Sequence, residues 1–93
     1  MKVTYSPRAI AQLNEIFAYI AKDNPMAAHA VIARIESVAA KLADFPHMGY
    51  ATDNGDFRVM NVERYPYLVF YAVLPERDEV RIVRIRHAAR QRP

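Results

Sequence analysis

Residues 65–74, Tyr-Pro-Tyr-Leu-Val-Phe-Tyr-Ala-Val-Leu, decide the fold of this 93-residue chain. The run is rich in aromatic and β-branched side chains and is apolar on both faces, which is typical of an interior strand. Pro66 lacks an amide donor and therefore belongs at the very start of the strand. We expect a sheet with this strand inside it, covered by helices on one face and partly covered on the other.

Shorter runs on either side of the central strand have the same β-branched or alternating character. A tight connection at residues 63–64 precedes the central strand, and a hairpin turn at residues 75–78 follows it. Residues 46–56 contain proline, asparagine and glycine without periodicity, which predicts a loop. The four expected strands are residues 2–5, 57–62, 65–74 and 79–86.

Two helices are predicted between the first strand and the loop. Ser6-Pro7 and Asn24-Pro25 each place a capping side chain before a proline at the first helical position. An apolar stripe at helical spacing follows each start, so we predict helices over residues 7–23 and 25–45 that form a hairpin. The fold class is α+β, in the order β-α-α-β-β-β, with the helical hairpin on one face of a small, mainly antiparallel sheet and a single domain over residues 1–93. The residues expected to be buried are Ile10, Leu13, Phe17, Ile20, Ile32, Ile35, Val38, Leu42, Val69, Val83 and Ile85.

Positive charge is concentrated at the end of the chain. Residues 81–93 carry five arginines and no acid, whereas the preceding residues sum to −2, and the pI is near 9.4. Arginine forks suit phosphates and carboxylates, so the partner is expected to be acidic, either nucleic acid or an acidic protein segment. By strand alternation, Val83 and Ile85 face the helices and Arg84 and Arg86 face away. Arg58 is expected on the same outer face, with Tyr65, Tyr67 and Tyr71 interleaved among the arginines.

Several classes of chemistry are disfavoured by the composition. The chain has no cysteine, no apolar run of signal-peptide length and no membrane-spanning segment, which indicates a soluble cytoplasmic protein. His29, His47 and His87 lack metal-ligand spacing, so no metal and no cofactor are expected. Metal-free RNA cleavage would need a base, an acid and cations. His87 or Glu63 could be the base, although the arginines and tyrosines equally suit partner binding and core packing.

An ordered set of short motifs resembles the ParE branch of the ParE/RelE toxin superfamily. The set covers nearly the whole chain in order, although each motif alone is weak. The resemblance implies the toxin of a type II toxin–antitoxin pair with the fold expected above. Its motifs are Tyr5-Ser6-Pro7, Tyr19-Ile20-Ala21, Asn24-Pro25 with Ala27-Ala28, Phe45-Pro46 with Gly49, Arg58-Val59, Tyr65-Pro66-Tyr67, Tyr71, and Val83-Arg84-Ile85-Arg86-His87-Ala88-Ala89-Arg90 with Pro93.

The resemblance also implies partners. A cognate antitoxin encoded in the same operon, often with a ribbon-helix-helix DNA-binding domain, would fold onto the toxin, and DNA would be contacted only through it. ParE-like toxins poison DNA gyrase, whereas RelE-like relatives cut mRNA on the ribosome. The nuclease branch places a catalytic tyrosine near the C-terminus, but the last tyrosine here is Tyr71. This departure favours a non-enzymatic gyrase inhibitor; the alternatives are an mRNA endonuclease and a non-toxic basic binding domain.

Site residues follow from these expectations. Target binding is assigned to the basic end of the chain, and antitoxin binding to the helical hairpin and the last-strand region. If the protein is a nuclease, His87, Arg84 and Arg58 would be its catalytic residues. The expected target-binding residues are Arg84, Arg86, His87, Arg90 and Arg92, and the expected antitoxin-binding residues are Arg58, Arg81, Ile16 and Tyr19.

Overall fold

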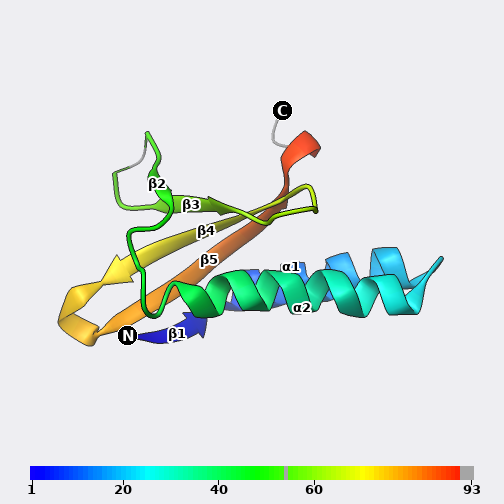
Figure 1. Cartoon of the computed structure of the whole chain (residues 1–93), viewed down its shortest axis with the longest axis horizontal. Helices are drawn as coiled ribbons and strands as arrows, with labels where there is room; N and C mark the ends of the chain where they lie inside the picture. The colour runs from blue at the N-terminus through cyan, green and yellow to red at the C-terminus, as the bar shows by residue number, and fades with distance from the viewer. Residues whose placement is uncertain (54, 91–93) are drawn as a thin grey trace.

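A hairpin of two helices lies along one face of a five-stranded sheet, below the sheet in Figure 1. The computed structural model describes residues 1–53 and 55–90. No helix in these two ranges has the length and apolar character that crossing a membrane requires. The elements are β1 (Lys2–Tyr5), α1 (Pro7–Ala21), α2 (Pro25–Lys41), β2 (Tyr50–Ala51), β3 (Arg58–Asn61), β4 (Tyr67–Leu74), β5 (Glu79–His87) and the 3-10 turns η1 (Pro75–Arg77) and η2 (Ala88–Arg90).

The predicted α+β class and the mainly antiparallel sheet are confirmed. The strand order is β1-β5-β4-β3-β2, in which β1 runs parallel to β5 and all other neighbours are antiparallel. β4 is interior, as its two apolar faces indicated. The expected loop at residues 46–56 contains one element that the prediction missed, the edge strand β2. Two residues carry no periodic signal, and β2 exists because Tyr50 and Ala51 pair with β3.

Both helices begin where the capping residues predict. The Ser6 hydroxyl accepts a hydrogen bond from the Ala9 amide at 3.1 Å, and the Asn24 side-chain oxygen accepts one from the Ala27 amide at 3.1 Å. The Ser6 hydroxyl also donates to the Val83 carbonyl at 3.1 Å, which ties the start of α1 to β5. The helices end two and four residues before the predicted limits of 23 and 45, within turns that their last carbonyls close.

The core lies between the hairpin and the sheet. The prediction of burial is confirmed for Ile35, Val38, Leu42, Val69 and Ile85. Leu13, Phe17, Ile20, Ile32 and Val83 are half-buried instead. Ile10 was expected inside and is 49% exposed, so this prediction is wrong. The apolar stripe of α1 is wider than the part of the helix that packs against the core. The residues of the stripe that pack against the core are Ala9, Leu13, Ile16 and Ile20. Ile10 and Phe17 line a shallow groove on the outer side of the hairpin.

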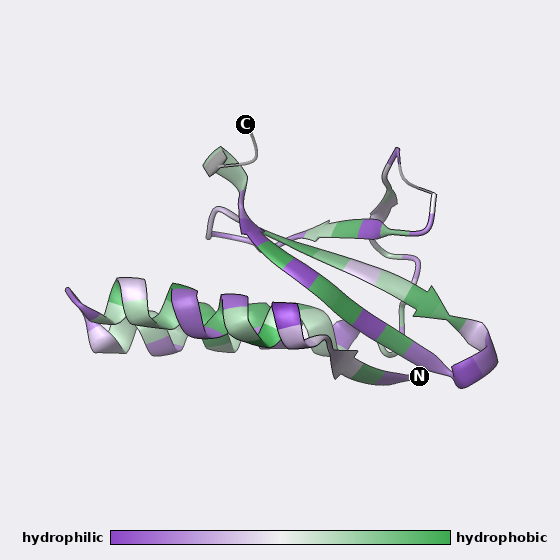
Figure 2. Cartoon of the chain, turned by 180° about the vertical axis from the view of Figure 1, so that it is seen from behind, coloured by the Kyte–Doolittle hydropathy of each residue, from purple (hydrophilic) through white to green (hydrophobic). Residues whose placement is uncertain are grey.

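The predicted faces of Ile85, Arg84 and Arg86 are confirmed, but a bulge in β5 overturns the prediction for Val83. Phe70 pairs with Arg84 but Tyr71 pairs with Ile82, so Val83 has no partner and the alternation shifts by one residue. Val80, Ile82, Ile85 and His87 therefore share the face toward the helices, and Arg81, Arg84 and Arg86 share the outer face. Figure 2 shows the resulting hydrophilic and hydrophobic bands along β5. Val83 was expected toward the helices; it lies at the bulge and lines a pocket on the outer face with Arg84.

Candidate functional site

The two faces of β5 present two different pockets. The helix-side pocket, of about 310 Å³, lies between α1 and the end of β5. The outer pocket, of about 440 Å³, lies on the sheet face away from the helices. The helix-side pocket is lined by Gln12, Glu15, Ile16, Tyr19, Tyr67, Ile85 and His87. The outer pocket is lined by Arg8, Thr52, Asp53, Phe57, Phe70, Val83 and Arg84.

The helix-side pocket joins apolar and polar groups at the far end of α1. Gln12 closes its inner end, because the side-chain oxygen accepts a hydrogen bond from the Ile85 amide at 2.7 Å. Ile16 is half-buried, whereas Tyr19 is 62% exposed at the rim. A large exposed aromatic beside an open pocket is a common anchor in protein interfaces, so this surface suits a protein partner.

His87 belongs to the helix-side pocket and is held in one orientation. Its ring meets the Tyr67 ring edge to face, with centroids 5.3 Å apart. Its Nδ1 atom accepts a hydrogen bond from the Ala89 amide at 3.1 Å, so the neutral ring carries its proton on Nε2. Tyr67 is the tyrosine neighbour that the sequence did not reveal, since the two residues meet only through the pairing of β4 with β5.

The outer pocket contains Arg84, an arginine of β5 whose pKa is shifted from its ordinary value. The Arg84 guanidinium lies over the Phe70 ring, 4.9 Å from its centroid. Burial lowers the pKa of Arg84, and the nearby positive charges of Arg86 and Arg8 lower its pKa further. Arg8 was not among the predicted site residues. It lies 76 positions from Arg84 in the sequence, and only the contact between the start of α1 and β5 brings the two together.

Arg58 does not share a face with Arg84 and Arg86, and the prediction that it does is wrong. Arg58 pairs with Tyr71, and cross-strand partners lie on the same face, which for Tyr71 is the core. The Arg58 Nη2 atom donates to the His47 carbonyl at 3.2 Å and to the Gly49 carbonyl at 2.6 Å. Arg58 thus holds the loop between α2 and β2.

The tyrosines likewise do not interleave with the outer arginines. Tyr67 and Tyr71 are buried on the helix side of the sheet, and the outer neighbours of Arg86 and Arg84 on β4 are Leu68 and Phe70. The expectation failed because the pairing of β4 with β5 puts Tyr67 opposite His87 and Tyr71 opposite Ile82, on the face away from Arg84 and Arg86.

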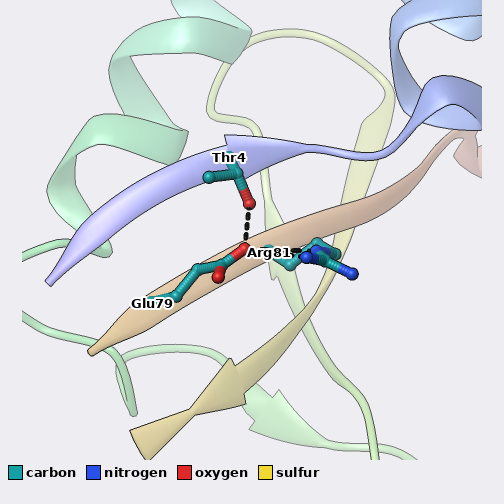
Figure 3. Close-up of polar contacts among 3 residues, drawn as sticks. All are labelled: Thr4, Glu79 and Arg81. Atoms are coloured by element: carbon teal, nitrogen blue, oxygen red, sulfur yellow. Dashed lines mark hydrogen bonds and ion pairs between the residues drawn. The ribbon is translucent and has the colours of Figure 1, made fainter. Parts of the chain in front are cut away.

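Arg81 is engaged within the sheet. Glu79 is 3% exposed, and its Oε2 atom accepts hydrogen bonds from the Thr4 hydroxyl at 2.5 Å and from the Arg81 Nε atom at 3.2 Å (Figure 3). The Thr4 hydrogen bond is the main cause of the lowered pKa of Glu79; Arg81 and Lys2 lower it as well, against the effect of burial. Arg81 therefore helps to join β1 to β5.

The three residues expected in a nuclease site are not brought together. His87 and Arg58 lie on the helix side of the sheet, in register with Tyr67 at the start of β4 and Tyr71 in its middle, and Arg84 lies on the outer face. Among the predicted target-binding residues, Arg92 lies outside the described residues and only the backbone of Arg90 is described. Within the described part of the chain, no group of three or more His, Cys, Asp or Glu side chains could hold a metal ion.

Comparisons with known proteins agree with the resemblance in the sequence. Residues 3–92 match the family described as "ParE toxin of type II toxin-antitoxin system, parDE". The chain is 37% identical to "Toxin RelE2" of Caulobacter vibrioides over 89 residues, covering 96% of this chain and 97% of that one.

Two solved structures share the fold. The structure titled "Chromosomal ParDE TA system from P. aeruginosa" has a TM-score of 0.80 and 22% identity, over 94% of this chain and 95% of that chain. The isolated E. coli RelE toxin has a TM-score of 0.72 and 13% identity, over 97% and 86%. At these identities the two structures establish the fold alone.

Proposed function

The chain belongs to the ParE toxin family of type II toxin–antitoxin systems, and on that premise we propose that it acts by binding DNA gyrase, without cutting RNA. As a toxin of this class it has a cognate antitoxin as its partner. The gyrase proposal rests on the separation of His87 and Arg58 from Arg84 by the sheet. General acid–base cleavage needs its base and its cations around one phosphate, within hydrogen-bond reach.

The outer pocket supports a binding role. It supplies Arg8 and Arg84, with Arg86 nearby, over an aromatic surface. No histidine, tyrosine or glutamate is among the described residues that line it. Such a surface can hold an anionic partner through charge-assisted hydrogen bonds. The proposed target contacts are this cluster together with His87, Arg90 and Arg92 at the basic end of the chain.

Induction in cells without antitoxin tests the target. DNA supercoiling, double-strand breaks and mRNA integrity are read in the same cultures. Broken or relaxed DNA with intact mRNA is expected, and His87→Ala should leave most of the effect in place. Codon-positioned mRNA cleavage with normal DNA, abolished by His87→Ala alone, would overturn the gyrase proposal.

An mRNA endonuclease is the second candidate function. It is favoured by arginines beside the half-buried aromatic rings of the outer pocket, since bases stack on aromatic rings while phosphates bind arginine. A third outcome, normal growth with both nucleic acids intact, would leave a non-toxic basic binding domain.

We assign the antitoxin contact to Ile16 and Tyr19 at the helix-side pocket. Arg58 and Arg81, also expected at this contact, are not among the residues that line the pocket: Arg58 bonds the loop before β2 and Arg81 bonds Glu79. The antitoxin, expected to be of the ribbon-helix-helix type and to make the only contact with DNA, would insert an apolar side chain into the helix-side pocket. Truncating an interface anchor typically costs about 2 kcal/mol or more, roughly a 30-fold loss of affinity. Tyr19→Ala should weaken the purified complex by that factor, whereas Tyr50→Ala, at an equally exposed tyrosine on β2, should not. Equal effects of the two variants would contradict the assignment.

A further inference from the structure

The outer pocket has an apolar floor large enough for one bulky side chain. Phe57, Phe70 and Val83 come from three different segments, and the cavity that they help to line has a volume of about 440 Å³. Thr52, Asp53 and Phe57, between β2 and β3, also line the cavity. Thr52 makes two hydrogen bonds to the Phe57 carbonyl, one from its amide at 3.2 Å and one from its hydroxyl at 3.0 Å. A preformed apolar hollow with a few polar groups at its edge is the usual form of a ligand site.

The two arginines of the outer pocket, Arg8 and Arg84, carry positive charge that no ion pair among the described residues neutralises. Neither Arg8 nor Arg84 lies within ion-pair distance of a carboxylate in that part of the chain. Arg84 instead packs over Phe70 while Arg8 and Arg86 repel it. An anion placed between Arg8 and Arg84 would relieve this repulsion.

One acid, Asp53, also lines the outer pocket and separates two classes of anionic ligand. A strand of nucleic acid presents repeated phosphates, which Asp53 repels. A polypeptide presents carboxylates that the arginines can bind, and backbone N–H groups that can donate hydrogen bonds to Asp53. The mixed charge therefore favours protein over nucleic acid.

We propose that the outer pocket binds a segment of the toxin's target protein in which an acidic residue stands beside a bulky apolar side chain. The proposal rests on the proposed function, in which the toxin acts by binding a protein. The apolar side chain enters the hollow against Phe70 and Val83, and the carboxylate lies between Arg8 and Arg84. The antitoxin contact assigned above lies on the opposite face of β5, so the occupant committed to here is the target.

Peptide titration of the full-length, ¹⁵N-labelled toxin tests the pocket directly. The probes are a twelve-residue peptide with Glu-Phe-Asp at its centre and Gly/Ser flanks, its Gln-Phe-Asn analogue, and a single-stranded six-nucleotide DNA. The acidic peptide should shift the amide signals of Phe70, Val83 and Arg84, and the neutral analogue should bind about 10-fold or more weakly. If the DNA shifts these amide signals and the acidic peptide does not, the pocket binds nucleic acid and the proposal is wrong. If none of the three probes shifts them, the pocket is not a binding site.

Substitutions of the two pocket arginines test whether they bind the carboxylates of the acidic peptide. Arg8→Gln and Arg84→Gln should each weaken the acidic peptide by about 10-fold to 100-fold, because each removes one charge-assisted contact. Arg77→Gln, at an exposed arginine in η1, is the matched control and should leave affinity unchanged. Unaltered thermal unfolding in all three variants separates lost contact from lost fold. Peptide binding that survives both pocket variants would refute the assignment.

A gyrase supercoiling assay with the same proteins distinguishes failure of this inference from failure of the proposed function. If the unaltered toxin, Arg8→Gln and Arg84→Gln all inhibit gyrase equally, the pocket does not bind the target, and the gyrase proposal is unaffected. No inhibition by the unaltered toxin would sink the gyrase proposal, and the peptide titration would still decide what the pocket binds. Inhibition that falls in parallel with peptide affinity is the expected result.

Discussion

Replacing Tyr71 by phenylalanine should destabilise the toxin by removing one hydroxyl from its core. Tyr71 is fully buried, and its hydroxyl donates to the Pro46 carbonyl at 2.8 Å and accepts from the Gly49 amide at 3.0 Å. The buried Gly49 amide would lose its acceptor, which costs about 1–3 kcal/mol. The half-buried Pro46 carbonyl would lose its donor, which costs about 0.5–1.5 kcal/mol. The expected loss in the free energy of unfolding is about 1.5–4.5 kcal/mol.

Urea denaturation of the free toxin at neutral pH measures this loss. In a domain of this size it corresponds to a fall in melting temperature of roughly 6–36 °C. Tyr65→Phe is the matched control, because Tyr65 is half-buried and no hydrogen bond to its hydroxyl is found among the described residues; it should cost less than about 0.5 kcal/mol. A change of less than about 0.5 kcal/mol for Tyr71→Phe would refute the view that this hydroxyl holds the loop.

Three further predictions concern stability, at Glu79, Ile35 and Gly49. The lowered pKa of Glu79 means that its stabilising effect is present above the ordinary value of 4.5 and is lost as the pH falls through the folded-state value. Glu79→Gln should therefore flatten the acid side of the stability curve, and the same flattening in exposed Glu76→Gln would contradict this. Ile35→Ala should cost about 2–5 kcal/mol and Ile10→Ala about 1 kcal/mol or less, by urea denaturation; equal costs would contradict the packing. Gly49→Ala puts a methyl group 2.5 Å from the Val59 carbonyl oxygen, so a melting temperature unchanged by this variant would refute the close approach; about 1–3 kcal/mol is expected.

The starts of the helices could be predicted because their causes are local. Ser6 and Asn24 bond to amides three positions later, and the following proline fixes the first helical residue. The ends were harder to locate, since the apolar stripe continues into the turns after Ala21 and Lys41. Family membership was also available from sequence, through the order of short motifs along nearly the whole chain.

The candidate site could be predicted only in part. Three residues named from the sequence line the two pockets: Arg84 the outer pocket, and Ile16 and Tyr19 the helix-side pocket. The charge of Arg84 is visible in the sequence, and Ile16 and Tyr19 followed from assigning the antitoxin contact to the helical hairpin. Arg8 was missed, since a single arginine in the first turn of a helix carries no such signal until β5 lies beside it. The role of Arg58 in holding the loop was missed for the same reason, because both its acceptors are backbone carbonyls.

The sequence by itself determined the helical hairpin, the long strands and the basic end of the chain, all of which depend on residues close together along the chain. Alternation in the sequence predicted the faces of Ile85, Arg84 and Arg86, whereas only the tertiary structure decided where the alternation of β5 breaks. Burial of Tyr71 and Val69 in the core sets the pairing of β4 with β5, and that pairing leaves Val83 unmatched as a bulge. Because side chains alternate with a period of two, the unmatched Val83 puts Val80 and Ile82 on the helix side with Ile85 and His87, and puts Arg81 on the outer face with Arg84 and Arg86.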